Sequence, residues 1–163
     1  MISTSPRRTS VAALTLVLLG SMSARPEVIR GPGERGDQPA TSDAAVQRLV
    51  DDYVGLYRKD ALDRWKTLFL PGFTASYTND DGSVTTRNLD AFYESQRSGF
   101  AAGDMSETLQ NVRIQRVGRL AHVSADFRFT SRGSARPGQL MLLMIEEKGQ
   151  LKIAALTFTY QLR

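Results

Sequence analysis

The chain of 163 residues has no cysteine, one histidine and one tryptophan. The absence of cysteine excludes disulfide bonds, thiolate zinc sites and a cysteine nucleophile. No group of histidine, aspartate and glutamate residues has the spacing of metal ligands, and neither a Ser-His-acid arrangement nor a glycine-rich phosphate loop is visible. We therefore expect no metal and no other cofactor.

Positive and negative residues are mixed along the sequence, which has no run of five like charges. The formal net charge is +4. Two of these charges, Arg7 and Arg8, lie in an N-terminal segment that we expect to be removed, which leaves about +2. A charge of this size favours solubility and is too small to indicate a nucleic-acid-binding surface. We expect no nucleic-acid partner.

The apolar segment Val11–Leu19 is too short to be a permanent membrane anchor. The Arg7–Arg8 pair before it and the small residues Ser21 and Ser23 after it predict a cleaved signal peptide over residues 1–24, and hence a periplasmic or secreted protein. The arginine pair leaves twin-arginine export open beside the general secretory route. Two alternatives are an uncleaved signal anchor, and a disordered basic tail that follows a misassigned start.

Residues 25–42 contain three glycines and three prolines with hardly any apolar content. This composition predicts a disordered linker, because it cannot bury enough apolar surface to become ordered. The remaining residues, 43–163, are numerous enough for one domain of ordinary size with its own hydrophobic core.

Three helices are expected in this domain. Asp43 or Ser42 can cap the first, and Asp60 is a plausible cap for a short second helix that Pro71–Gly72 ends. Asn88 caps a third, which we expect to end near Gly99. The first helix has an apolar stripe with helical spacing, formed by Val46, Leu49, Val50, Tyr53, Val54 and Tyr57.

Six strands are expected, and most of them follow the helices, so they should pair mainly as an antiparallel meander. They are Phe73–Tyr77, Val84–Thr86, Leu109–Val117, Leu120–Thr130, Gln139–Glu147 and Leu151–Leu162. A tight turn at Asn79–Gly82 joins the first two. We expect Arg136–Gly138 to break the sheet, and the stretch Leu140–Ile145, apolar on both faces, to be a central strand.

The order of these elements resembles the nuclear transport factor 2-like superfamily, which includes SnoaL-like and ketosteroid-isomerase-like proteins. The similarity covers about residues 44–162. It rests on three degenerate motifs in the same order as in the family: an opening helix pair from Val50–Tyr53 to Leu68–Pro71, a hairpin and third helix from Asn79–Gly82 to Phe92–Tyr93, and a terminal motif Lys148–Ile153 with Leu151 where tryptophan is usual. The resemblance implies an α+β fold, in which a cone-shaped, curved antiparallel sheet, mixed at its edge, packs against three N-terminal helices.

The resemblance also implies where chemistry would take place. Reactive groups of the family lie on the concave face of the sheet, and ketosteroid-isomerase-like members use a carboxylate to move a proton next to a carbonyl group. In this chain, Asp126 and His122 share one face of a strand and could form a dyad. The apolar residues Val123 and Phe127 take the other face, so we expect the dyad to lie outside the cup. We assign no catalytic residue.

Aromatic and hydroxyl-bearing side chains should face the cup instead. They are Tyr53, Tyr57, Trp65, Tyr77, Phe92, Phe127 and Tyr160. They could hold a small apolar ligand, or they could simply form the core, since aromatic residues at this spacing usually do.

Two functions stay open at this point. The first is an exported small-ligand-binding or accessory domain without an identifiable reaction, which the lack of a visible acid in the cup favours. The alternative is an isomerase or lyase of the SnoaL-like or ketosteroid-isomerase-like kind that acts on a small apolar carbonyl compound, with a tyrosine such as Tyr57 polarising the carbonyl. We expect a homodimer that pairs through the outer face of the sheet, around His122, Asp126 and Arg128.

Overall fold

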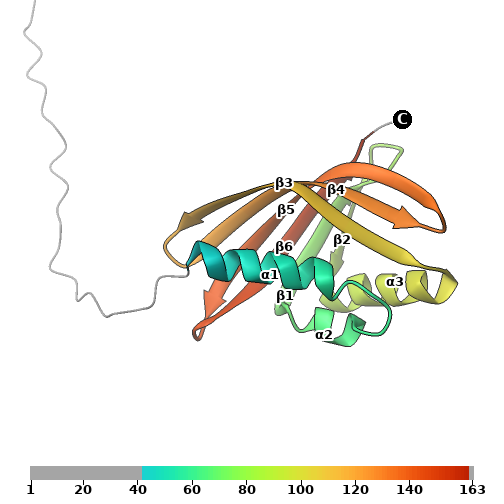
Figure 1. Ribbon diagram of the computed structural model, residues 1–163. Coiled ribbons are helices and arrows are strands. Elements are labelled where there is room, and N and C mark those ends of the chain that lie inside the picture. Colours follow the sequence, from blue (N-terminus) through green and yellow to red (C-terminus); the bar gives the residue numbers. More distant parts are fainter. Residues whose placement is uncertain (1–41, 162–163) are drawn as a thin grey trace, which may run out of the picture. The chain divides into compact units, whose positions relative to one another are not determined.

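The computed structural model describes residues 42–161, so the predicted signal peptide and all of the predicted linker except Ser42 lie outside the described residues. Three helices and six strands follow one another along this part of the chain (Figure 1). Their bounds are α1 Asp43–Gly55, α2 Leu62–Lys66, β1 Phe69–Thr78, β2 Val84–Asn88, α3 Leu89–Ala102, β3 Met105–Val117, β4 Leu120–Ser131, β5 Ser134–Glu147 and β6 Gln150–Tyr160. None of the described helices has the length and apolar character needed to span a membrane.

Helix α1 forms as its apolar stripe predicts. The Ser42 hydroxyl caps it by accepting a hydrogen bond from the Ala45 N–H at 3.2 Å. Its buried face includes Val46, Val50 and Tyr53, whereas the acidic side chains of residues 51 and 52 are exposed. The buried face packs against strands β3 and β6, and this contact fixes the direction in which Tyr53 points.

The other two helices differ in part from the sequence-based expectation. The predicted cap Asp60 does not cap α2, because the N-cap position is Ala61, which makes no side-chain capping hydrogen bond. Asn88 does cap α3, since its side-chain oxygen accepts from the Ala91 N–H at 2.9 Å. Helix α3 continues past Gly99 to Ala102.

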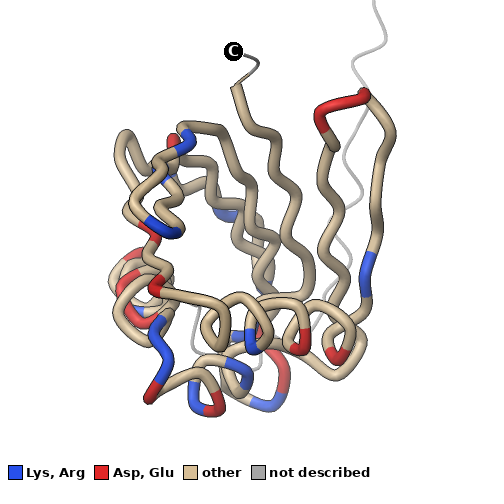
Figure 2. The backbone as a smooth tube through the Cα atoms, turned by 90° about the vertical axis from the view of Figure 1, so that its right-hand side faces the viewer, with Lys and Arg blue, Asp and Glu red and all other residues tan. Residues whose placement is uncertain are grey.

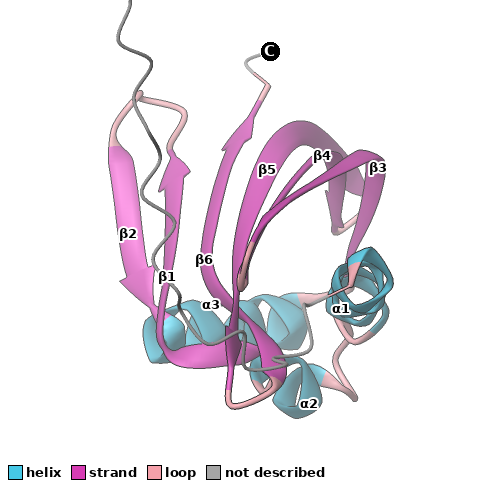
Figure 3. Cartoon of the chain, turned by 90° about the vertical axis from the view of Figure 1, so that its left-hand side faces the viewer, coloured by secondary structure: helices cyan, strands magenta, loops and turns pink. Residues whose placement is uncertain are grey.

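The six strands form one sheet in the order β2-β1-β6-β5-β4-β3. All neighbouring pairs are antiparallel except β1 and β6, which are parallel, so the sheet is mixed near one edge as the resemblance implies. The sheet curves strongly, and its concave side faces the helices (Figure 3). Helix α3 packs against β1 and β2, and α1 packs against β3 at the opposite edge.

Two predicted breaks lie inside strands instead. Pro71–Gly72 is part of β1, at the point where the register between β1 and β6 shifts. Pro137 lies in β5 opposite Arg128, and its carbonyl oxygen accepts a hydrogen bond from the Gln161 N–H. In antiparallel strands, the N–H and C=O groups of one residue point to the same neighbouring strand. The N–H group that Pro137 lacks would therefore point to the end of β6, where the pairing of β5 and β6 stops, so its absence removes no hydrogen bond from the middle of the sheet.

Strand β4 has the alternating burial that its sequence predicts. Its inward residues Ala121, Val123, Ala125 and Phe127 are buried, and the residues between them are half-buried or exposed. The central position of β5 is confirmed as well, because β5 lies between β4 and β6.

Candidate functional site

A cavity of about 240 Å³ lies between the concave face of the sheet and the helices α1 and α3. Its wall is mostly aromatic and aliphatic. The polar groups on the wall are four tyrosine hydroxyls and the side chains of Ser95, Gln96 and Glu107. A largely apolar wall with a few converging polar groups is the usual form of a small-molecule site.

Six of the seven predicted pocket residues line this cavity: Tyr53, Tyr57, Tyr77, Phe92, Phe127 and Tyr160. Tyr53, Tyr57, Phe92 and Phe127 also belong to the buried core, so for these residues lining the cavity and filling the core are not exclusive. Their role in holding a ligand stays a prediction.

Trp65, the seventh residue, is fully buried and is not part of the cavity wall. Its indole N–H donates a hydrogen bond to the backbone oxygen of Tyr53 at 3.0 Å. Its ring packs against Tyr53, Tyr57 and Phe92. Trp65 therefore supports three residues of the wall from behind.

One residue of the wall, Glu107 on the edge strand β3, is not among the residues predicted from the sequence. It lies opposite Phe129 of β4 and shares the inward face of β3 with Met105 and Leu109. Glu107 as a residue is half-buried, but its carboxylate oxygen Oε1 is inaccessible to solvent and has no hydrogen-bond partner among the described residues. The expectation that the concave face carries no acid is therefore wrong.

A sequence signal for Glu107 existed. The predicted strand began at Leu109, whereas β3 begins at Met105. Residues two positions apart in a strand lie on the same face, so extending the strand backwards by two residues places Glu107 on the same face as Leu109. A charged residue at an inward position is uncommon, and for this reason it is informative.

The environment of Glu107 changes its acidity. Burial in the cavity raises the pKa of the carboxyl group from 4.5 to about 7, because the charged form loses its hydration. Hydrogen bonding to the Tyr53 hydroxyl acts in the opposite direction and lowers the pKa by less. The carboxyl group can thus both release and accept a proton near neutral pH.

The neighbouring phenols stay protonated at neutral pH. Burial, followed by the nearby Glu107 charge, raises the pKa of Tyr53 and Tyr57 above that of a free phenol. The same two causes raise the pKa of Tyr160 to about 12. These hydroxyls can therefore serve as hydrogen-bond donors but not as bases.

The predicted dyad lies outside the cavity. Asp126 points away from the buried face of β4 and accepts hydrogen bonds from Asn111 at 2.7 Å and from Gln139 at 3.2 Å. These bonds lower its pKa. His122 belongs to the same outward row and, like Asp126, is not part of the cavity wall. Among the described residues, no group of acidic and histidine side chains is arranged to hold a metal ion.

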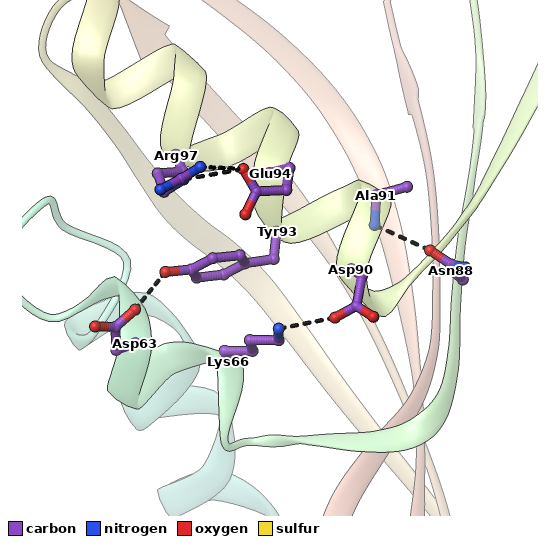
Figure 4. Close-up of polar contacts among 8 residues, drawn as sticks. All are labelled: Asp63, Lys66, Asn88, Asp90, Ala91, Tyr93, Glu94 and Arg97. Atoms are coloured by element: carbon purple, nitrogen blue, oxygen red, sulfur yellow. Dashed lines mark hydrogen bonds and ion pairs between the residues drawn. The ribbon is translucent and has the colours of Figure 1, made fainter.

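Polar contacts on the surface hold α3 in place (Figure 4). Lys66, at the end of α2, forms an ion pair with Asp90 at 2.8 Å, and the Tyr93 hydroxyl donates a hydrogen bond to Asp63 of α2. This surface network ties α3 to α2, while residues 95 and 96 of α3 form part of the cavity wall.

Comparison with known families agrees with this geometry. The sequence model of the SnoaL-like domain matches residues 38–157. This chain belongs to the SnoaL-like domain family. The resemblance drawn from the sequence motifs is thereby confirmed, as is the α+β fold class.

Solved structures show the same fold as this SnoaL-like domain. One is an NTF2-like protein of unknown function from Shewanella baltica OS155, with 13% identity, a TM-score of 0.59 and coverage of 74% of this chain and 94% of that one. A second, provisionally named a scytalone dehydratase, is from Novosphingobium aromaticivorans, with 18% identity, a TM-score of 0.60 and coverage of 74% and 84%.

A third is a provisionally named dehydratase of the NTF2-like family from Streptomyces avermitilis, with 13% identity, a TM-score of 0.61 and coverage of 74% and 96%. No curated protein sequence matches the chain significantly. At these levels of identity the likeness shows the fold alone.

Proposed function

We propose that this SnoaL-like domain is an acid–base enzyme, an isomerase or lyase that moves a proton next to the carbonyl group of a small, largely apolar compound. The observation that carries the proposal is the position of Glu107. An acid with a free, buried oxygen faces an apolar cavity, and its pKa is about 7. A general base works best when its pKa is close to the working pH.

The walls of the cavity supply the other requirements of this chemistry. Removing a proton next to a carbonyl group places negative charge on the carbonyl oxygen, and a preorganised donor in a dry site stabilises that charge. Four tyrosine side chains line the same cavity as Glu107. The apolar wall would exclude water and favour a substrate without many polar groups.

Two structural neighbours that are provisionally named dehydratases are consistent with a lyase. They carry little weight here, because fold similarity at 13% and 18% identity does not transfer a reaction. Export of this domain and its assembly as a homodimer also stay predictions.

Proton exchange tests the proposal without knowledge of the substrate. A panel of small cyclic ketones is incubated with the protein in D₂O, and deuterium uptake next to the carbonyl is followed by NMR. We expect the wild-type protein to accelerate exchange for some members of the panel, with a rate that rises as the pH passes through about 7. We expect Glu107→Gln to lower this rate by about a hundredfold or more.

Asp126→Asn is the matched control, because it neutralises a carboxylate on the outer face of the sheet. It should exchange protons at the wild-type rate. Equal rates for wild type and Glu107→Gln would contradict the proposal. A wild-type protein that binds the ketones without any exchange would favour the other function, a ligand-binding domain without a reaction.

A further inference from the structure

Arg136 lies on the concave face of the sheet, next to the cavity. It is the cross-strand partner of Phe129, which lines the cavity, and directly opposed residues of antiparallel strands project from the same face. The next residue on this face of β5 is Gly138, which pairs with Tyr160 of the cavity wall. Arg136 therefore continues the inward row of β5 beyond the wall, although it is not itself part of the wall.

The exposure of the wall residues shows where the cavity opens. Phe129, Tyr77 and Tyr160 are half-buried. Phe127 and Leu156, which lie farther back along β4 and β6, are buried. Exposure thus increases toward the end of the sheet at which β6 stops and β5 begins, and this end is the mouth of the cavity.

Two contacts hold the Arg136 guanidinium at this mouth. It lies over the Tyr160 ring, 4.1 Å from the ring centroid. Its Nη2 atom donates a hydrogen bond to Asp80 Oδ1 at 2.5 Å, which is also an ion pair. Asp80 belongs to the turn between β1 and β2, and acidic residues lie at the tip of this hairpin (Figure 2). The ion pair therefore joins the tip of the hairpin to the start of β5, across the end of β6.

The Arg136 guanidinium can bind more than Asp80. A guanidinium group has five N–H donors in a planar fork that matches a carboxylate. In the described part of the chain, Asp80 supplies the one acidic partner of this group. The Asp80 side chain is 77% exposed, and an exposed ion pair contributes little to stability. The carboxylate of a ligand can therefore share or replace this contact at small cost.

A cross-strand row leads from Arg136 to Glu107. Phe129 of β4 pairs with Arg136 of β5 on one side and with Glu107 of β3 on the other. Neighbouring strands are about 4.8 Å apart, so the backbones at Arg136 and Glu107 are roughly 10 Å apart. Both side chains project from the concave face. A small molecule is therefore long enough to contact both groups.

Building on the proposed function, we propose that Arg136 binds a carboxylate group of the substrate at the mouth of the cavity, so that the substrates are small keto acids with an apolar body. The apolar body fills the aromatic cavity, and the C–H group next to the carbonyl faces Glu107. The carboxylate stays at the mouth, where it keeps part of its hydration. A single negative charge suits this site, because the arginine is already shared with Asp80.

Arg87 is the competing cation. It lies opposite Ala75 of β1, on the same face of the sheet, and it is half-buried like Arg136. Its guanidinium donates hydrogen bonds to the Tyr77 hydroxyl at 3.0 Å and to the backbone oxygen of Ala91 at 3.5 Å. Two of its donors are thus directed to neighbouring groups of the protein. Arg136 is the better site, because its acceptor is an exposed side chain that a ligand can displace.

The test compares keto acids with their amides. The panel consists of 3-oxocyclohexanecarboxylate, 4-oxocyclohexanecarboxylate and 4-acetylbenzoate, each with the matching carboxamide, which has the same skeleton without the charge. Isothermal titration calorimetry at low ionic strength measures the affinities. We expect the wild-type protein to bind at least one acid about tenfold more tightly than its amide. This preference should decrease as salt is added.

Two substitutions should act in opposite directions. Arg136→Gln should remove the preference for the acid and leave the affinity for the amide nearly unchanged, and Arg136→Lys should retain part of the preference. Asp80→Asn should raise the affinity for the acid several-fold, because it removes the competing carboxylate. An ion pair that only holds the hairpin in place would make Arg136→Gln and Asp80→Asn change the affinity for both probes in the same direction.

A wild-type protein that binds no acid of the panel more tightly than its amide would overturn the proposal. A preference that survives Arg136→Gln but is lost in Arg87→Gln would place the carboxylate at Arg87 instead. Deuterium exchange with the same compounds separates these failures from that of the proposed function. Exchange that depends on Glu107, with the same kcat/KM for acids and amides, overturns the Arg136 site alone. A preference that depends on Arg136, without exchange in wild type, supports the Arg136 site and overturns the proposed reaction.

Discussion

At the scale of single residues, Glu107 illustrates the cost of placing an acid in an apolar cavity. The folded protein holds its proton up to a pH of about 7, whereas a glutamate in the unfolded chain releases it near 4.5. An unfolded chain that ionises more readily than the folded one is favoured as the pH rises. The stability associated with neutral Glu107 is therefore complete below pH 4.5 and is lost progressively until about pH 7.

This linkage gives a prediction for stability. Each unit of pKa difference corresponds to about 1.4 kcal/mol, so the wild-type free energy of unfolding should fall by about 2–3 kcal/mol between pH 5 and pH 8 through this one group. The Glu107→Gln protein has no carboxyl group at this position, so its free energy of unfolding should not show this fall. Urea denaturation of both proteins at pH 5 and pH 8 measures this fall. The contributions of the other titrating groups are common to wild type and variant, so they cancel when the two changes in free energy are subtracted. An equal pH dependence of the two proteins would contradict the prediction.

Residue-level reasoning from the sequence identified the aromatic wall but not the acid. The wall residues lie in strong helical and strand patterns, so their faces could be predicted. Glu107 lies at the start of an edge strand with weak alternation, where propensity alone does not show which face is buried. Arg87 of β2 donates a hydrogen bond from Nε to the hydroxyl oxygen of Tyr77 of β1 at 3.0 Å, and this contact depends on cross-strand geometry that no spacing in the sequence reveals.

At the scale of elements, the fit between β4 and β5 depends on a glycine. Gly138 lies directly opposite Phe127, and a Cβ atom at Gly138 would clash with the backbone carbonyl oxygen of Thr159 on β6 and come within 2.5 Å of the Phe127 ring. The Phe127 ring therefore packs directly on the backbone of Gly138, which has no side chain. This arrangement sets the position of one part of the cavity wall, because Phe127 also packs edge-on against Phe158 and Tyr160.

Gly138→Ala should therefore displace both the Phe127 ring and the β6 backbone at Thr159. We expect a loss of about 1–3 kcal/mol in the free energy of unfolding, as for other overpacked sites, together with weaker binding of a small, largely apolar aromatic probe such as 4-nitroanisole in the cavity. Gly72→Ala is the matched control, since nothing lies within 4 Å of a Cβ atom built at this other strand glycine. Chemical denaturation and ligand titration measure both effects. A Gly138→Ala protein as stable as the Gly72→Ala protein would show that Phe127 and the backbone at Thr159 can both move without cost.

The elements themselves were largely predictable, and their ends were not. The helical stripe of α1, the Asn88 cap and the alternation of β4 are local patterns that the chain's own spacing determines. The continuation of β5 through Pro137 depends on where its neighbour β6 stops, which is a property of the sheet and not of the segment. The irregular start of β1 at Pro71–Gly72, where its register with β6 shifts, likewise depends on the neighbouring strand.

At the scale of the whole domain, the curved sheet separates two faces with different surroundings. The concave face is covered by helices and contains the cavity. The opposite face of β3, β4 and β5 is uncovered by any described element. Of the five large apolar residues that are exposed within residues 42–161, four lie there: Val117, Leu120, Met141 and Leu143. Their cross-strand neighbours include His122, which is opposite Leu143.

This outer face is where the predicted homodimer would form. The interface predicted from the sequence is polar and surrounds His122, Asp126 and Arg128, and the structure adds exposed apolar side chains from the central strand β5. A second copy of the chain would cover that row, because apolar side chains on a central strand otherwise remain in contact with water. Polar neighbours around an apolar centre are the usual composition of an interface between subunits.

Leu143→Glu should therefore convert a dimer into a monomer, because a charge at the centre of such an interface would be buried without a partner. Size-exclusion chromatography with light scattering measures the mass of each form. Val84→Glu is the matched control: Val84 is the fifth exposed apolar residue, 68% exposed, and it lies on the other edge strand, β2. The control should stay dimeric. A wild-type protein that is monomeric at micromolar concentration would contradict the predicted dimer, and a Leu143→Glu protein that stays dimeric would place the interface elsewhere.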